Sequence, residues 1–282
     1  MRLLVPLGLA GVLLAGCSDQ TPTAPPEPSA TPPSPAGTPA AASPSAPAAA
    51  QARAVYWLGA SKEPRGPRLY REFVRRPAGP DPVRDALETM FGSEPKDPDY
   101  TSLWAEGTTV RDVRRDGTTA VVDLSREALQ SGGGSGFEGA SIQQLVHTVT
   151  AADPDVRAVQ LLVDGERVET LWGHADLTKP VSRAPAAEVL GPVWLDVEEG
   201  GTIRGDFGGT ATVFEATVSW EFRQGDRVVQ EGFSTASEGA PGRGDWTGTA
   251  DVPPGDYELW AYESSARDGS VTWLDTKRVT VS

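Results

Sequence analysis

The chain has 282 residues, enough for two small domains, and carries 25 Lys and Arg against 39 Asp and Glu, a formal net charge of -14. This acidity disfavours nucleic acid or an anionic lipid surface as the main partner, because both would be repelled. Cys17 is the single cysteine. No disulfide can therefore form within the chain, and each domain must be held together by its apolar core.

Residues 1–16 have the order of an export signal. Arg2 supplies the positive charge, the apolar run Leu3–Leu14 follows, and two small residues precede Cys17. The run is too short to remain as a membrane-spanning helix. The stretch Leu14-Ala15-Gly16-Cys17 resembles the lipobox of bacterial lipoproteins. That resemblance implies that the signal is removed, that Cys17 is acylated, and that the mature protein is held at the outer face of the cell membrane.

Residues 17–52 are expected to form a tether behind the acylated cysteine. From Thr21 to Ala52 the chain is almost wholly Pro, Ala, Ser and Thr, with too little apolar bulk to offset the entropy of ordering. A polyproline-like chain extends by about 3.1 Å per residue, so such a segment reaches roughly 100 Å when stretched.

Residues 53–179 are expected to form an α+β module with two helices. The first is predicted over Pro82–Phe91, with Asp81 as its N-cap and Gly92 at its end. The second has Ser141 as one candidate N-cap, with an earlier start as the alternative, and ends at Asp153-Pro154. Apolar residues fall on one face of each helix: Val83, Ala86, Leu87, Met90 and Phe91, then Ile142, Leu145, Val146 and Val149.

Each predicted helix is followed by two β-like runs around an Asp-Gly turn. The first pair covers residues 109–124 and the second covers residues 156–172. With a leading strand at 54–58, the sequence predicts a two-layer α+β domain built from two helix-plus-hairpin repeats. Its sheet is expected to carry both helices on one face.

Residues 180–192, rich in Pro and Ala, are expected to be a linker, and residues 193–282 an all-β module. Alternating apolar and polar residues from Phe214 to Phe222 predict a strand with one solvated face, which places Trp220 in the core. Further runs of this kind give about seven strands. That number is typical of an antiparallel, immunoglobulin-like sandwich.

Several short stretches of the first module resemble the GerMN domain, named from sporulation and spore-germination proteins. They are VVDLS at 121–125, GGS at 133–135 with Glu138, the helix at 142–150, and VQLLVDG at 159–165. The second module resembles Gmad2, an immunoglobulin-like domain found alongside GerMN. Its matching residues are Gly205, Phe214-Glu215-Ala216, Gly232-Phe233, Gly255, Tyr257, Tyr262-Glu263-Ser264 and Asp268-Gly269. These resemblances imply a non-catalytic envelope protein that acts in interaction or assembly, with a partner protein or with itself.

No cofactor, metal site or catalytic centre is expected from the remaining residues. His147 and His174 have no neighbour at a metal-ligand spacing, so structural or surface roles are favoured. Gly134–Gly139 matches Gly-x-Gly-x-x-Gly, but no strand runs directly into it. A flexible helix-entry loop is therefore favoured, with a small anion-binding nest as the alternative. The acidic pairs Asp153 with Asp155 and Glu198 with Glu199 fit no calcium-loop pattern and are interpreted as surface charge.

Tryptophans are the remaining candidates for ligand contact. Trp246 and Trp273 of the β module are expected to be exposed, where they could stack on wall sugars or anchor a protein partner. Three hypotheses therefore remain. The leading one is a lipid-anchored interaction protein, the second is binding of cell-wall polysaccharide, and the third is a hydrolase, which would need a deep pocket with converging carboxylates or histidines.

Overall fold

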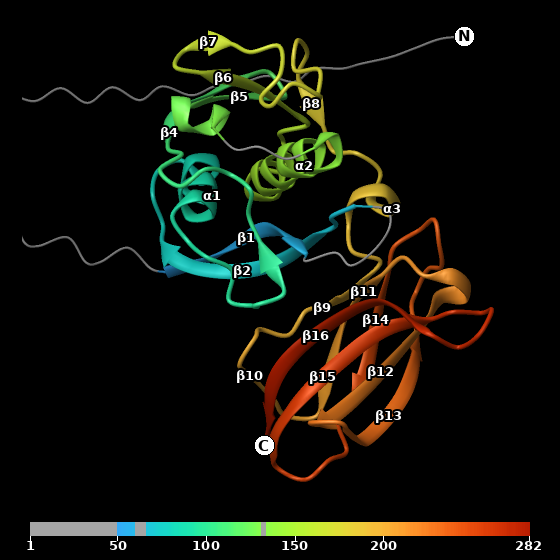
Figure 1. Ribbon diagram of the computed structural model, residues 1–282. Coiled ribbons are helices and arrows are strands. Elements are labelled where there is room, and N and C mark those ends of the chain that lie inside the picture. Colours follow the sequence, from blue (N-terminus) through green and yellow to red (C-terminus); the bar gives the residue numbers. More distant parts are fainter. Residues whose placement is uncertain (1–49, 60–65, 131–133) are drawn as a thin grey trace, which may run out of the picture. The chain divides into compact units, whose positions relative to one another are not determined.

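The computed structural model describes residues 50–59, 66–130 and 134–282 (Figure 1). The predicted signal peptide, its lipobox with Cys17, and the tether up to residue 49 lie outside the described residues. Within the described ranges, no helix is long and apolar enough to cross a membrane.

The first module contains two sheets, with strand orders β2-β1-β3 and β4-β5-β6-β7. Within the second sheet β4 and β5 are antiparallel, whereas β5 and β6 are parallel. The elements are β1 Ala50–Gly59, β2 Leu69–Pro77, α1 Pro82–Phe91, β3 Tyr100–Thr101, β4 Val110–Asp116, β5 Thr119–Leu124, a 3-10 helix Arg126–Leu129, α2 Ser135–Ala152, β6 Ala158–Val163 and β7 Glu166–Arg167.

The prediction of a single sheet with both helices on one face is wrong. Helices α1 and α2 both contact β1 of one sheet, while α1 also contacts β4 and α2 contacts β6 of the other (Figure 1). In α2 every residue from Ser141 to Val149 is buried, so the helix has no solvated stripe. A helix buried all round needs partners on both sides, and this places the helices between two sheets.

The predicted helix-plus-hairpin repeat is not confirmed. The first hairpin, β4 with β5, has the expected length and turn. The second consists of two residue pairs between β6 and β7, after which the chain leaves the sheet. Leu171 and Leu177 of the departing segment are buried in the core instead. A strand pattern thus continues in the sequence where the backbone follows a surface loop that buries two leucine side chains.

Helix α2 begins earlier than the apolar pattern indicates. Its N-cap is Gly134 and its first residue is Ser135. The interpretation of Gly134–Gly139 as a flexible helix-entry loop is therefore wrong, because these residues form the first turns of the helix. Glycine is a poor helix former, and the tertiary contacts of Glu138 described below hold this end in place.

Residues 180–192 contain regular structure. Strand β8, Val181–Ser182, pairs with β6, and the short helix α3, Ala186–Val189, follows. Both pack against the apolar core of the first module, and Leu190 is buried in it. This segment therefore extends the first module up to the start of the second.

The second module is built almost entirely from strands in two sheets, ordered β10-β16-β15-β12-β13 and β14-β11-β9, which agrees with an immunoglobulin-like fold. Its elements are β9 Val193–Leu195, β10 Gly201–Ile203, β11 Asp206–Ala211, a 3-10 helix Phe214–Ala216, β12 Thr217–Gln224, β13 Arg227–Thr235, β14 Gly244–Thr249, β15 Gly255–Ser264 and β16 Val271–Val281 (Figure 1).

Aromatic rings form the centre of this module. The ring of Phe207 lies edge-on to Trp220, Phe222 and Trp246, with centroids 5.2, 5.1 and 6.0 Å away. Trp220 is therefore in the core, as predicted. Phe214 is not part of the strand. Positive φ angles at Glu215 and Ala216 break the alternation, and the Phe214 side chain is 65% exposed.

Candidate functional site

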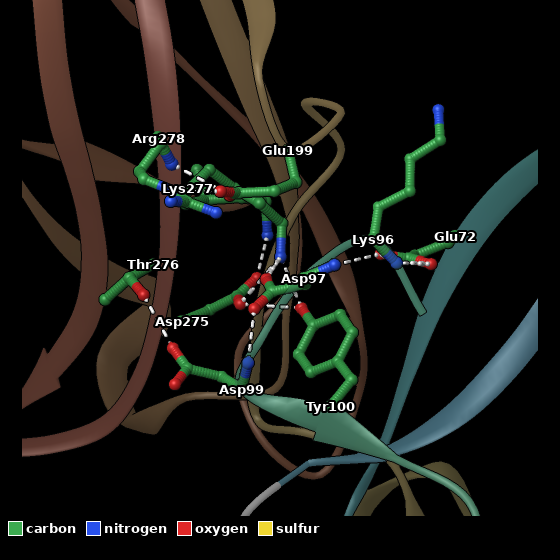
Figure 2. Close-up of polar contacts among 11 residues, drawn as sticks. Glu72, Lys96, Asp97, Asp99, Tyr100, Glu199, Asp275, Thr276, Lys277 and Arg278 are labelled. Carbon is green, nitrogen blue, oxygen red and sulfur yellow. Dashed lines mark hydrogen bonds and ion pairs between the residues drawn. The ribbon is translucent and has the colours of Figure 1, made fainter. Parts of the chain in front are cut away.

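A group of four polar side chains, Asp97, Tyr100, Asp275 and Lys277, joins the first module to the second (Figure 2). We call this group the clamp. Lys277 donates hydrogen bonds to Asp97, to Tyr100 Oη at 2.6 Å and to Asp275 Oδ1 at 3.3 Å. Tyr100 in turn donates to Asp275 Oδ1 at 2.7 Å. All four side chains are buried, with exposed fractions of 1% to 7%.

Local structure explains how these residues meet. On β16, Asp275 and Lys277 lie in phase with the core residues Val279 and Val281, so they point inward. On the first module, Asp97 Oδ1 accepts from the Asp99 amide at 2.8 Å, which shapes the turn that leads into β3 and Tyr100. The turn before β3 and the middle of β16 thus present opposite charges to each other away from water.

Glu72 of β2 holds the start of the same turn by hydrogen bonds to its backbone amides. Its carboxylate accepts from the amides of Lys96 and Asp97 at 2.9 to 3.1 Å (Figure 2). On the second module, Asp275 Oδ2 accepts from the Leu195 amide at 2.7 Å. Asp97 and Asp275 therefore each bond to backbone as well as to side chains, and a buried ion pair requires such additional partners.

Burial and neighbouring charges shift the pKa values of the clamp. Burial raises the pKa of Asp97 to about 6, although the Lys277 ammonium opposes this shift. For Lys277, burial would lower the pKa, but the carboxylates of Asp275 and Asp97 outweigh it and raise the pKa. Burial and the same two carboxylates raise the pKa of Tyr100, so its hydroxyl remains a donor.

Asp97 is expected to make stability depend on pH. Its ordinary pKa is 3.8 and its folded value is about 6, so between these values the folded chain binds more protons than the unfolded chain. The stabilisation is fully present below the lower value and is lost as pH rises through the higher one, a change of up to about 3 kcal/mol.

Urea unfolding of the wild-type protein and of Asp97→Asn, between about pH 4 and pH 7, measures this effect. The asparagine side chain cannot titrate, so the free energy of unfolding of the wild-type protein should fall relative to that of the variant as pH rises. A difference between the two proteins that stayed constant over this range would contradict the assignment.

An apolar contact accompanies the clamp. Trp194 of β9 belongs to the second module by sequence, yet its ring is buried in the core of the first module. Its Nε1 donates to the Leu69 carbonyl at 3.1 Å, and the Arg243 guanidinium lies 4.1 Å from the ring centroid. The two modules are therefore joined by a buried aromatic side chain as well as by buried charges.

The surroundings of the clamp leave room for little more than a water molecule. A cavity of about 30 Å³ lies beside Lys277, bordered by Arg71, Phe73 and Lys96 among others. All the side-chain polar groups of the clamp already have partners. Such an arrangement can hold two modules in register, and it offers no bound substrate a route to its carboxylates.

Glu138 is a second buried carboxylate with a defined role. Its oxygens accept from the Thr170 hydroxyl at 2.9 Å and from the amides of Leu171, Trp172 and His174 at 3.1, 2.9 and 2.7 Å. Burial opposes its ionisation, but these hydrogen bonds outweigh burial and lower the pKa of Glu138. Glu138 thereby fastens the loop after β7 to the start of α2.

The two tryptophans predicted to be exposed differ from that expectation. Trp246 is 3% exposed and packs on Phe207, so its prediction as a contact residue is wrong: β14 turns this side chain toward the core. Trp273 is half-buried at a positive φ of 52°, and the Arg68 guanidinium lies 5.5 Å from its ring centroid. Its ring packs against the core of the second module.

The histidines and acidic pairs do not converge. His147 is buried, and burial lowers its pKa to about 3, while His174 donates its backbone amide to Glu138. Asp153 pairs with Arg115, and Glu199 pairs with Arg278. In the part of the chain that the structure describes, no group of three or more His, Cys, Asp or Glu side chains could hold a metal ion.

The sequence interpretation missed the clamp entirely. A signal was present, because Asp275 and Lys277 occupy inward positions of an alternating strand where apolar residues are expected. Their partners Asp97 and Tyr100 lie more than a hundred residues earlier in a turn. No local pattern links the two segments.

Comparison with known proteins places both modules. Residues 54–169 match the family described as sporulation and spore germination (Germane), and residues 196–270 match the immunoglobulin-like domain of bacterial spore germination (Gmad2). No curated protein matches the chain.

Several solved structures match the chain at low identity, among them the following two. One is a candidate lipoprotein from Clostridium perfringens, with 17% identity, TM-score 0.34, and coverage of 48% of this chain and 88% of the other. The other is the first GerMN domain of the sporulation protein GerM from Bacillus subtilis, with 18% identity, TM-score 0.38, and coverage of 47% and 98%. The chain thus carries one region that matches the Germane family of sporulation and spore germination and a second region that matches the Gmad2 immunoglobulin-like domain.

Proposed function

We propose that this chain is a non-catalytic envelope protein, anchored by acyl groups on Cys17, that acts as an interaction or assembly module at the outer face of the membrane. The observation that carries the proposal is the buried junction of the two modules. Lys277, Asp97 and the Trp194 ring tie a GerMN domain to a Gmad2 domain, and the described residues beside Lys277 enclose a cavity of about 30 Å³, which is too small for a substrate.

The buried junction supports a role in which the outer surfaces of the two modules are presented together to a partner protein or a second copy. Burying a charge costs several kcal/mol unless it is paired. In the clamp, the carboxylates of Asp97 and Asp275 share the Lys277 ammonium, and each also accepts a backbone hydrogen bond. Exposed pairs between Arg71 and Asp196 at 2.6 Å and between Lys96 and Glu198 at 3.4 Å surround it. Such a junction holds the outer surfaces of the two modules in one arrangement, which a partner protein or a second copy can recognise as a unit.

The lipobox resemblance supports anchoring and leads to a direct prediction. Cys17→Ser is expected to shift the protein from the membrane fraction to the released fraction. Serine lacks the thiol to which the acyl chains are attached, and without these chains nothing holds the protein firmly at the membrane. Fractionation followed by immunoblotting measures the shift. The control is a substitution in the proposed tether, Ser18→Ala, which should leave fractionation unchanged. Retention of Cys17→Ser in the membrane would contradict the anchor.

Crosslinking in intact cells tests the interaction role. A photoreactive residue at an exposed position of each module should recover the same partner protein, or a second copy of the chain, from both positions. The control places the same group in the proposed tether, where recovery should be lower. Absence of any protein adduct from either module would contradict an interaction role.

A further inference from the structure

The outer face of the five-stranded sheet carries a patch without ionic side chains. Phe233 of β13 lies opposite Ser219 of β12, and Ser219 lies opposite Tyr262 of β15. Two residues after Tyr262 on β15, Ser264 lies opposite Val271 of β16. These five residues form what we call the aromatic-hydroxyl patch. Phe233 is 73% exposed and Val271 is 45% exposed, so the patch is open to solvent.

The geometry of the sheet spaces the two aromatic rings. Phe233 and Tyr262 lie on the two strands that flank β12 (Figure 1). Neighbouring strands are about 4.8 Å apart, so the two side chains start roughly 9.6 Å from each other. The serine between them is short. Its hydroxyl lies 3.0 Å from the Ser264 hydroxyl, and either can be the donor.

Tyr262 is held in place before any ligand binds. Its hydroxyl donates to Glu221 Oε1 at 2.7 Å, and Glu221 Oε2 accepts from Arg223 at 2.9 Å. Burial and the Glu221 hydrogen bond raise the pKa of Tyr262 to about 12. A ring that is already oriented loses little conformational entropy on binding, which favours stacking on its face.

Charges around the patch limit the kind of ligand it can take. Glu221, Glu231 and Glu263 border it, and the whole chain is acidic. Anionic polymers would therefore be repelled. A cationic segment would find few carboxylates without a partner. Glu221 is bound to Tyr262 and Arg223, and Glu263 accepts from the Phe214 amide at 2.7 Å.

We propose that the aromatic-hydroxyl patch binds an uncharged oligosaccharide chain, with sugar rings stacked on Phe233 and Tyr262 and sugar hydroxyls bonded to Ser219 and Ser264. Aromatic faces offer large apolar contact area, and serine hydroxyls both donate and accept hydrogen bonds. The spacing of the rings exceeds one sugar ring, so a chain of several linked sugars engages both. The inference goes beyond the protein contacts proposed above and does not depend on the anchor.

Binding of the full-length protein to N-acetylglucosamine oligomers of increasing length tests the proposal. Titration followed by tryptophan fluorescence or calorimetry should show little binding of the monosaccharide and tighter binding as the chain lengthens across both rings. Phe233→Ala and Tyr262→Ala should each weaken binding of the longer oligomer by roughly two- to ten-fold. Because Phe233 is solvent-exposed, its removal should leave the unfolding midpoint unchanged.

Phe137→Ala serves as the matched control, since Phe137 is 46% exposed on α2 of the other module. It should bind the oligomer as tightly as the wild-type protein. Equal affinity of wild-type and Phe233→Ala for the longer oligomer would overturn the proposal, as would binding that did not depend on oligomer length. Self-association lost in Phe233→Ala, without any sugar binding by the wild-type protein, would overturn it in favour of a contact between copies.

Discussion

Lys277→Met is expected to lower the free energy of unfolding by about 3–5 kcal/mol, the usual cost of removing one partner of a buried ion pair. Methionine fills a similar volume but leaves Asp97 and Asp275 buried without a cation. Urea unfolding followed by far-UV circular dichroism measures the loss. Asp97→Asn added to Lys277→Met should restore part of it, because one of the uncompensated charges disappears.

Lys96→Met is the matched control for this experiment. Lys96 also pairs across the two modules, with Glu198 at 3.4 Å, but both side chains are about half exposed, at 51% and 52%. Exposed pairs contribute about 0–1 kcal/mol, so this variant should unfold close to the wild-type midpoint. Equal effects of the two lysine substitutions would contradict the assignment of the clamp as the main polar contact between the modules.

Glu138→Ala is expected to cost a similar amount, about 3–5 kcal/mol, for a different reason. The substitution removes the acceptor of the buried Leu171 amide and of the partly buried amides of Trp172 and His174, and each unsatisfied buried donor costs about 1–3 kcal/mol before relaxation. The loss of protection should begin in the loop that Glu138 binds, before the rest of the first module unfolds. Hydrogen exchange at these three amides is expected to accelerate under conditions in which the rest of the first module stays protected.

Glu169→Ala is a suitable control for the second experiment, because Glu169 is an exposed carboxylate at the start of the same loop. Its side chain has no assigned partner among the described residues, so the change in stability should stay within about 0.5 kcal/mol. If Glu138→Ala and Glu169→Ala had similar unfolding midpoints, Glu138 would not be the residue that fastens this loop.

Parts of the structure that depend on neighbouring residues could be predicted from the sequence. Helix α1 spans Pro82–Phe91 as predicted, with Asp81 accepting from the amides of Val83 and Arg84. The hairpin of β4 and β5 forms around its Asp-Gly turn. In both cases the determining contacts lie within a few residues, so the pattern contains all the information that the element needs.

Elements that are buried on more than one side were predicted poorly. In α2 the pattern marks one apolar stripe, yet Gln144, His147 and Thr148 are buried as well. These polar residues are buried because β1 and β6 of the two sheets cover different faces of the helix, which the stripe in the sequence does not indicate. Trp246 was misplaced for a similar reason, since the strand that carries it is short and its neighbours are mostly glycine and threonine.

Periodicity predicted the order of the two modules and the α+β and all-β character of each, and short motifs resembled the two families that the comparisons match. The two sheets of the first module, the entry of Trp194 into the first core and the contact of Lys277 with Asp97 are visible only in the folded molecule. Whether a charge or a second helix face is buried depends on segments far away in the chain, and a local pattern does not contain them.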